Sequence, residues 1–219
     1  MHLMSNISVK LAPIKPILQA SKLYFSHTSQ KLFTDFSASI PPGITLVVGG
    51  DGRGKSTLLR LLAGVLPAQN GQLYIDGVDL QAEPANYKAQ VFWTEPRSDA
   101  YDPLTVLDYF QLQRSSYATF DDAVLAEMTG GLGLQEHLHK QLFMLSTGSK
   151  RKVFLAAAFA SNARVTLLDE PFAALDTVSI GFILAWLQDT SSEHERAWVI
   201  ANYVAPPELH LSQIIDLGD

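Results

Sequence analysis

The segment ITLVVGGDGRGKS, residues 44–56, carries the strongest structural information in the chain. It opens with an apolar, β-branched run at 44–48, a pattern typical of a strand that is buried on both faces. The next eight residues match the pattern G-x-x-x-x-G-K-[ST] in full, and a Leu-rich helix that ends at a glycine is predicted over 55–64. A strand, a glycine-rich turn and a helix in this order predict a phosphate-binding loop.

The chemistry of this loop depends on its backbone and on two side chains. Glycines allow the backbone N–H groups to point inward, and the start of the helix adds partial positive charge toward a phosphate. Lys55 can reach the β and γ phosphates of a nucleotide, and the Ser56 hydroxyl can coordinate Mg²⁺. The predicted nucleotide-binding residues of the segment are Gly49, Gly50, Asp51, Gly52, Arg53, Gly54, Lys55, Ser56 and Thr57.

A second candidate site element lies at 165–170, where an apolar strand ends in two carboxylates. The carboxyl ends of parallel strands face the ligand crevice of an α/β sheet. Asp169 is therefore the expected magnesium ligand, and Glu170 is expected to polarise a water for attack on a γ-phosphate. Together with the phosphate loop, the pair predicts a nucleoside triphosphate site.

The rest of the chain alternates strands with helices, which predicts an α/β fold with a largely parallel sheet. Pro13 and Pro16 indicate an extended or loose start. Helices are predicted at 55–64, 104–113, 121–128, 146–160 and 177–188, and strands at 33–40, 44–48, 73–75, 91–93, 165–168, 198–201 and 214–217.

Composition excludes several function classes. The chain has 219 residues, of which 47% are hydrophobic and 17% charged, so it suits one large domain with a sizeable core. The net charge of -6 argues against nonspecific electrostatic binding of nucleic acid by the chain as a whole. The absence of cysteine excludes disulfides and thiolate metal sites. The longest apolar run, 153–160, is far below the roughly 18 residues of a membrane span, and we expect a cytoplasmic protein.

Two further motifs make the chain resemble the ATP-binding cassette of ABC transporters. Residues 145–149, Leu-Ser-Thr-Gly-Ser, are similar to the family signature Leu-Ser-Gly-Gly-Gln, and they lead into a basic helix. Residues 173–176, Ala-Ala-Leu-Asp, are similar to the D-loop. The resemblance covers 18–218 and is greatest to compact bacterial export cassettes of the haem-exporter and ABC-2 types.

This resemblance implies a P-loop NTPase fold with a mostly parallel, RecA-like core sheet, an antiparallel β part and an inserted helical lobe. Residues 1–219 would form a single ATP-binding domain, with the core at about 18–95 and 146–219 and the lobe at about 96–145. The lobe would carry the docking groove for a separate transmembrane permease. The cassette would then lie on the cytoplasmic, inner face of the cell membrane.

The resemblance also implies a mechanism that needs two cassettes, in a homo- or heterodimer paired head to tail. Ser146 and Gly148 of one cassette would donate hydrogen bonds to the γ-phosphate of an ATP, with its Mg²⁺, held by Lys55 of the other. ATP would join the halves, and hydrolysis would release them.

Three places depart from the family pattern; one is the signature, where Thr147 replaces the first glycine and Ser149 the glutamine, a version we interpret as tolerated. Glu95 stands where a glutamine usually contacts magnesium and water, and we retain it as a metal ligand. Asn202 stands in place of the switch histidine; it keeps one amide donor but carries no positive charge. The expected catalytic set is Glu170, Lys55 and Asn202. For the adenine, the family alignment favours His27, with Tyr24 and Phe25 as competitors that could equally be strand core.

Two alternatives remain open at this point. Glu95 and Asn202 are compatible with a cassette that closes on ATP but hydrolyses it poorly, as the impaired half of a heterodimer. A non-transport ABC ATPase of translation or DNA repair is disfavoured, because the chain has one cassette, no coiled-coil heptads and no cysteine.

Overall fold

The computed structural model of the protein describes residues 15–27, 30–95, 98–191 and 195–218. Residues 1–14 and 219 of the predicted domain, and residue 96, where the predicted lobe begins, lie outside these ranges.

A five-stranded parallel sheet forms the centre of the fold, as predicted. Its strand order is β6-β7-β8-β3-β9, and all four neighbouring pairs are parallel. Connections between parallel strands need long crossovers, and here helices supply most of them. The strands are β3 (Gly43–Val48), β6 (Val91–Trp93), β7 (Val165–Asp169), β8 (Ala197–Ala201) and β9 (Leu211–Asp216).

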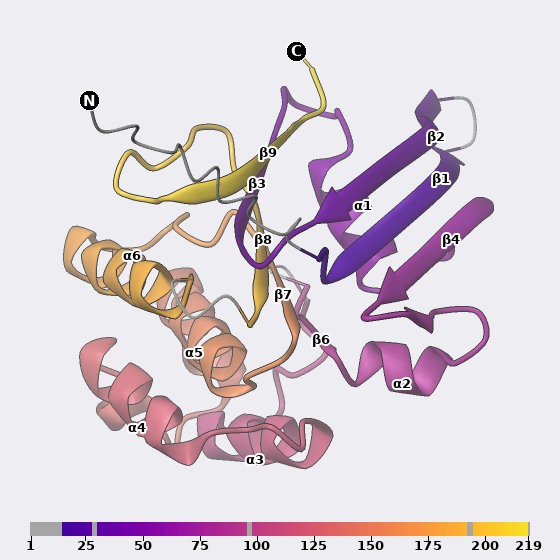
Figure 1. Ribbon diagram of the computed structural model, residues 1–219. Helices are drawn as coiled ribbons and strands as arrows, with labels where there is room; N and C mark the ends of the chain where they lie inside the picture. The colour runs from indigo at the N-terminus through magenta and orange to yellow at the C-terminus, as the bar shows by residue number, and fades with distance from the viewer. Residues whose placement is uncertain (1–14, 28–29, 96–97, 192–194, 219) are drawn as a thin grey trace, which may run out of the picture.

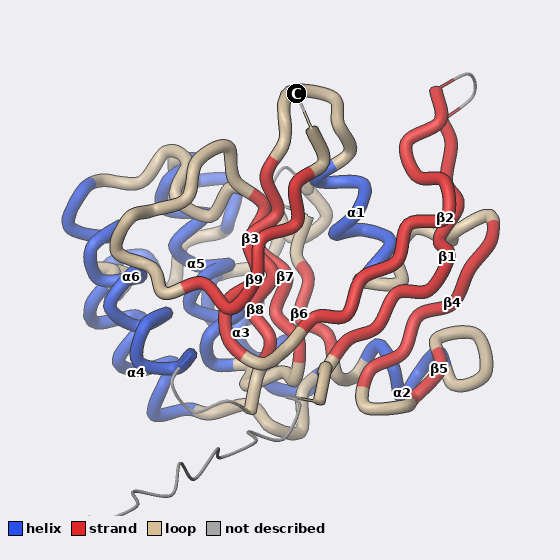
Figure 2. The backbone as a smooth tube through the Cα atoms, turned by 45° about the horizontal axis from the view of Figure 1, so that its top comes forward, coloured by secondary structure: helices blue, strands red, loops and turns tan. Residues whose placement is uncertain are grey.

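A second, antiparallel sheet lies beside α1 with the order β2-β1-β4-β5 (Figures 1 and 2). Its long strands cross the right-hand side of both views, apart from the helices α3 to α6. The strands are β1 (Leu18–His27), β2 (Gln30–Ile40), β4 (Asn70–Ile75) and β5 (Val78–Asp79).

Helices cover the parallel sheet on both faces, which is why its inner strands β7, β8 and β3 are almost entirely apolar, whereas the edge strand β9 carries polar and exposed residues. α3 and α4 lie together below α5 in Figure 1, between β6 and α5 in the chain. Two 3₁₀ turns, η1 (Gln135–His137) and η2 (Leu142–Met144), join α4 to α5. The α-helices are α1 (Lys55–Leu62), α2 (Pro84–Lys88), α3 (Val106–Ser116), α4 (Asp122–Gly131), α5 (Thr147–Ala160) and α6 (Thr177–Ser191).

The central strand β8 shows how one sheet separates two cores. Trp198 and Ile200 point into the core shared with α5 and α6. Ala197, Val199 and Ala201 alternate with them and point into the core shared with α1 and the antiparallel sheet. All five side chains are buried, because successive residues of a strand face opposite sides.

The sequence prediction missed β1, the two-residue strand β5 and α2, and placed several boundaries a few residues off. β1 escapes the alternating pattern because its register shifts between Ala20 and Leu23, and both of these residues are buried. Lys22, inside this bulge, has a φ of 49°, and its N–H donates to Ser37 Oγ at 2.9 Å. The bulge moves the buried positions out of phase by one residue.

The starts of α3, α4 and α5 follow capping residues. Thr105 accepts a hydrogen bond from the Asp108 N–H, and Asp108 caps Thr105 in return, so α3 begins at Val106 and not at the predicted residue 104. Asp121 caps α4, and Ser146 caps α5.

No helix among the described residues is long and apolar enough to cross a membrane.

Candidate functional site

The candidate site lies at the carboxyl end of the parallel sheet. The glycine-rich loop follows β3, Glu170 follows β7, and Asn202 and Tyr203 follow β8. Because β8 lies between β7 and β3, Asn202 and Tyr203 lie between Glu170 and the glycine-rich loop. This edge of a parallel sheet is where ligands of α/β folds bind.

A cavity of about 330 Å³ opens at this edge. It brings together segments that lie far apart in the sequence: the glycine-rich loop with the start of α1, Glu170 and the end of β1. Its lining residues are His27, Leu32, Asp51, Gly52, Arg53, Gly54, Lys55, Ser56, Thr57, Glu170 and Tyr203.

The loop is shaped around Lys55. Gly54, the N-cap of α1, has a φ of 94°, a left-handed conformation that favours glycine. The Lys55 ammonium is tied to the loop itself: Nζ donates to the carbonyl oxygens of Gly49 at 2.6 Å and Gly50 at 3.0 Å. Lys55 is 7% exposed, so its charge is positioned before any phosphate arrives.

Asp169 and Ser56 form the second part of the site. Burial raises the pKa of Asp169, and the charges of Glu170 and Glu95 raise it further, whereas a hydrogen bond from Ser56 and the charge of Arg151 lower it. A carboxylate that is desolvated near like charges is a place where a cation would be stabilised.

The donor set fits magnesium and not an all-protein metal cage. In the described part of the chain, no three His, Asp or Glu side chains cluster closely enough to hold a metal ion. Mg²⁺ commonly binds through one or two carboxylates together with substrate phosphates and waters. Asp169 and Ser56 match that mode.

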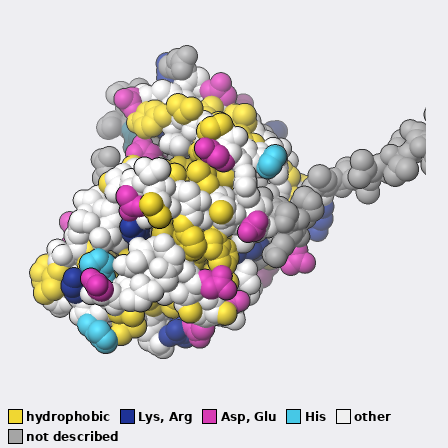
Figure 3. Space-filling view, turned by 90° about the vertical axis from the view of Figure 1, so that its left-hand side faces the viewer, with side chains coloured by type: hydrophobic (Ala, Val, Ile, Leu, Met, Phe, Trp, Pro, Cys, Tyr) yellow, Lys and Arg dark blue, Asp and Glu magenta, His cyan; other side chains and the backbone are white. Residues whose placement is uncertain are grey.

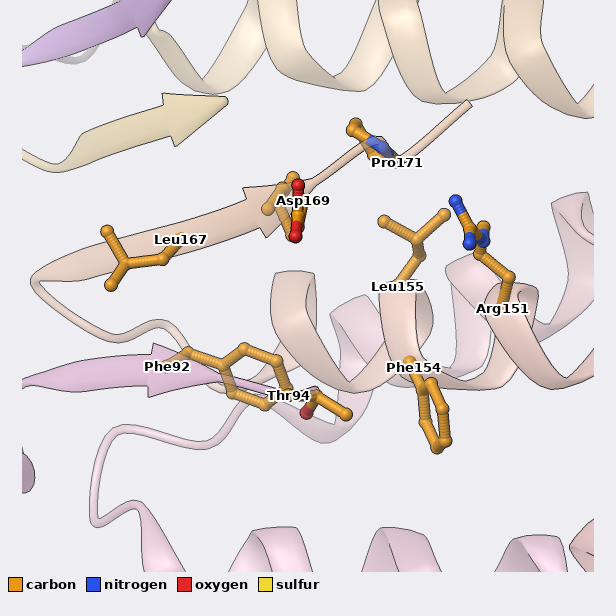
Figure 4. Close-up of a pocket in the computed structure, with 9 residues that line it drawn as sticks. Phe92, Thr94, Arg151, Phe154, Leu155, Leu167, Asp169 and Pro171 are labelled. Carbon is orange, nitrogen blue, oxygen red and sulfur yellow. The ribbon is translucent and has the colours of Figure 1, made fainter. Parts of the chain in front are cut away.

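A small cavity of about 40 Å³ lies behind Asp169, between β6, β7 and α5. Figure 4 shows Asp169 at the end of β7, with Leu155 and Arg151 of α5 on the other side of this space. The remaining wall is largely apolar. These apolar side chains around Asp169 are consistent with the burial that raises the pKa of its carboxyl.

The backbone positions Glu170. Its φ is 46°, its N–H donates to the Ala201 carbonyl at 2.9 Å, and its own carbonyl accepts from Arg151. These bonds fix the turn after β7 and leave the Glu170 carboxylate on the wall of the large cavity.

Two predicted site residues have other partners in this structure. The Glu95 carboxylate pairs with Arg60 at 3.5 Å, with both side chains more than two-fifths exposed. Asn202 uses its amide to donate to the Val204 carbonyl at 3.1 Å, and it is not among the residues that line the cavity.

The signature-like residues lie at the start of α5, apart from the cavity lining. Ser146 Oγ accepts from the Ser149 N–H at 3.1 Å, as an N-cap. A Cβ on Gly148 would stand 2.4 Å from the Ala174 carbonyl oxygen, so this helix start touches the segment that resembles a D-loop. Within one chain, Ser146 and Gly148 therefore do not join the pocket.

At the other end of the cavity, the structure distinguishes the three aromatic candidates. His27 lines the cavity, whereas Tyr24 and Phe25 do not. Phe25 is 6% exposed and packs its ring edge-on against His27, with centroids 4.8 Å apart. Phe25 thus belongs to the core and supports His27 from behind.

Sequence reasoning missed Tyr203. The Lys55 ammonium lies 4.1 Å from the centroid of its ring, and the Tyr203 hydroxyl donates to Asp51. That hydrogen bond and the charges of Asp51 and Glu170 raise the pKa of Tyr203 to about 12. Its place one residue after Asn202, at the end of a buried strand, was the available signal.

Comparison with known proteins gives a consistent result. The family model described as ABC transporter matches residues 33–173. The cytochrome c biogenesis ATP-binding export protein CcmA of Idiomarina loihiensis is 35% identical over 200 residues, which are 90% of this chain and 88% of that protein. The taurine import ATP-binding protein TauB of Escherichia coli O6:K15:H31 is 33% identical over 165 residues, 73% of this chain and 63% of that protein.

Among solved structures, the ATP-binding subunit of an ABC transporter has the same fold. Its TM-score is 0.77 at 22% sequence identity, over 86% of this chain and 80% of that one.

Proposed function

The chain belongs to the ABC transporter family, and from this premise we propose how its own residues bind and hydrolyse ATP. It is an ATP-binding, ATP-hydrolysing subunit that drives a membrane transporter. One observation carries the residue assignments: Lys55 and Glu170, 115 positions apart in the sequence, line the same cavity.

The phosphate loop binds the triphosphate through backbone N–H groups, and Lys55 neutralises its β and γ phosphates. His27 stacks on the adenine at the far end of the cavity. Glu170 accepts a proton from the attacking water. These roles suit the cavity lining, since the base and the ammonium face the same space.

Ser56 and Asp169 would hold Mg²⁺, with Glu95 as a further oxygen ligand once it leaves Arg60. When bound, Mg²⁺ would neutralise negative charge on the phosphates of the nucleotide. The chain's own contribution is to hold the Asp169 carboxylate and Ser56 hydroxyl beside the phosphate loop.

Ser146 and Gly148 act on the ATP of a second cassette. Their distance from the cavity lining of their own chain supports this arrangement, because a donor that cannot reach its own nucleotide can serve a partner's. Whether the second cassette is an identical chain or a related one, ATP is buried between the phosphate loop of one and the signature of the other.

We further propose an export-type cassette that docks on a permease at the inner face of the membrane. The match to an export protein extends over 90% of the chain, against 73% for the import protein. Purification with the native permease, followed by ATP-dependent substrate uptake into inverted membrane vesicles, tests the direction. Uptake only into right-side-out vesicles would indicate import.

Phosphate release in a single turnover tests the ATPase assignment. The chain in excess over MgATP is expected to release inorganic phosphate, and chelation of Mg²⁺ by EDTA is expected to stop it. Glu95 pairs with Arg60, and Asn202 donates to the Val204 carbonyl, which favours one rival function. In that function the chain is the half of a heterodimer that hydrolyses ATP poorly. Tight MgATP binding without phosphate release would support that rival.

A further inference from the structure

Tyr203 occupies a position in the nucleotide cavity that the family pattern does not assign. It follows β8, the strand between those that carry Glu170 and the phosphate loop. Its side chain therefore approaches both halves of the site at once. It is 53% exposed, on the open side of the cavity and not in the core.

Three charged groups surround the Tyr203 side chain. The Lys55 ammonium lies over the ring at 4.1 Å, and the hydroxyl donates to the Asp51 carboxylate of the phosphate loop. The Glu170 carboxylate is close enough to act electrostatically on the same hydroxyl. An O–H donor thus lies beside the ammonium that receives the phosphates and beside the proposed base.

Asn202 is the residue at the switch position. Its side-chain amide donates a hydrogen bond to the Val204 carbonyl at 3.1 Å, within the same turn. It does not line the cavity, whereas Tyr203 does. The Tyr203 ring lies 4.1 Å from the Lys55 ammonium, so a phosphate bound to Lys55 would lie close to the Tyr203 side chain. Phosphate oxygens would compete with Asp51 for the Tyr203 proton, and both are anionic acceptors that form strong hydrogen bonds.

We propose that the Tyr203 hydroxyl is a catalytic hydrogen-bond donor to the terminal phosphate of bound ATP. This inference rests on the proposed function. In the hydrolysis step, the water oxygen bonds to the γ-phosphorus, the bond to the β–γ bridging oxygen breaks, and the water proton passes to Glu170. Tyr203 keeps its own proton and stabilises the charge that develops on a γ-phosphate oxygen.

The test is Tyr203→Phe in the full-length chain, which removes the hydroxyl and keeps the ring over Lys55. Tyr74→Phe is a matched control, because Tyr74 lies opposite Asp79 in the antiparallel sheet, outside the cavity lining. Loss of one donor to developing charge predicts a single-turnover rate about hundredfold to thousandfold lower for Tyr203→Phe. The Kd for MgATP should stay within about threefold, and Tyr74→Phe should match the wild type.

A transition-state analogue separates this role from a structural one. The affinity for ADP with orthovanadate should fall by the same factor as the hydrolysis rate in Tyr203→Phe, while the affinity for ADP alone is retained. Tyr203→His, whose ring carries an N–H donor, should recover part of the rate, whereas Tyr203→Leu should not. The His and Leu variants keep the test decisive if Tyr203→Phe folds poorly.

The outcomes are distinct. A Tyr203→Phe rate equal to the wild type, or higher, overturns the inference and leaves the proposed function standing; a higher rate would mean that the hydroxyl only obstructs the pocket. A hydrolysis rate that is the same for Tyr203→Leu and Tyr203→His also overturns the inference. A wild-type chain that binds no MgATP overturns the proposed function, and this inference with it.

Discussion

Lys55 illustrates at the scale of one residue how the pocket is organised before nucleotide binds. Its ammonium has two loop carbonyls and an aromatic ring as partners, and almost no contact with water. The desolvation cost of this charge is thus already met by the fold, and phosphates need only replace or join these partners.

Lys55→Ala is therefore expected to weaken MgATP binding. Hydrogen bonds to charged groups contribute about 1.5–3 kcal/mol each, so the Kd should rise at least about tenfold. Titration with a fluorescent ATP analogue measures the change. Lys88→Ala, an exposed lysine at the end of α2, is the control and should bind as the wild type does. An unchanged Kd for Lys55→Ala would remove Lys55 from the phosphate site.

Asp169→Asn is expected to stabilise the nucleotide-free protein. The folded chain raises the pKa of Asp169 through burial and nearby carboxylates, so it holds this proton more tightly than the unfolded chain does. As the pH rises above the unfolded pKa of Asp169, the unfolded chain loses this proton first, and the free energy of unfolding falls. The fall is complete once the pH has passed the folded pKa of Asp169. At neutral pH the ionised carboxylate costs stability, which asparagine avoids.

Thermal unfolding without Mg²⁺ measures this effect. The Tm of Asp169→Asn should exceed that of the wild type at pH 7.5, and the difference should shrink as the pH falls and the wild-type carboxyl takes up its proton. Added MgATP should raise the Tm of the wild type more than that of the variant. A variant less stable than the wild type at pH 7.5 would contradict the origin given for this pKa shift.

Single residues of the site differ in how far the sequence reveals them. The phosphate loop is contiguous, and its residue pattern alone predicts its backbone path. The assignment of Asp169 and Glu170 needs only the polarity of a parallel strand. Tyr203 depends on which strand lies between two others, and the strand order is a property of the whole sheet that local patterns do not specify.

Among elements, the contact between the start of α5 and the turn before α6 couples two motifs. Gly148 approaches the Ala174 carbonyl, and Lys152 of α5 pairs with Asp176 at 2.7 Å. The Asp176 carboxylate also accepts from the Ser179 N–H at 2.9 Å and so caps α6. Hydrogen bonds from Lys152 and Ser179 hold the pKa of Asp176 well below its usual range.

Gly148→Ala is expected to lower the Tm, although alanine is the better helix former. A Cβ at 2.4 Å from a backbone carbonyl oxygen forces the two segments apart, and overpacking of this kind costs about 1–3 kcal/mol. Gly181→Ala in α6 is the matched control, since nothing lies within 4 Å of its added Cβ. It should gain about 0.5–1 kcal/mol from helix propensity.

Thermal melts of the two variants decide the point. A lower Tm for Gly148→Ala and a higher Tm for Gly181→Ala would support a tight contact between the start of α5 and the turn that precedes α6. A rise for both would mean that this contact is loose.

Element boundaries show where sequence patterns stop being informative. α3, α4 and α5 begin after capping residues that a hydrophobic pattern does not register, so α3 was placed too early. β1 was missed because the Lys22 bulge breaks its alternation, and the bulge depends on tertiary contacts such as Gly71 against the Lys22 carbonyl. The buried strands β3, β7 and β8 were predicted, because a continuous apolar run can be recognised from the sequence without knowledge of tertiary contacts.

For the whole molecule, the separation of Ser146 and Gly148 from the pocket is the observation that supports the proposed pairing of two cassettes. The surface near the signature and the D-loop also exposes large apolar side chains: Phe143 is 57% exposed, Met144 58% and Val178 79%. Figure 3 views the side that carries α6, where yellow hydrophobic atoms interrupt the polar surface. Exposed apolar groups of this kind are typical of interaction surfaces, and they suit a partner cassette that closes over the nucleotide.

The measurement that tests this account most directly is the mass of Glu170→Gln in MgATP, by size-exclusion chromatography with light scattering. Glutamine keeps the shape of the side chain but cannot accept the proton, so ATP should stay bound and hold two cassettes together at about twice the 24.0 kDa of one chain. The variant should return to 24.0 kDa when nucleotide is removed. Glu170→Gln that hydrolyses MgATP at the wild-type rate, or that binds it and remains a single chain, would contradict the account.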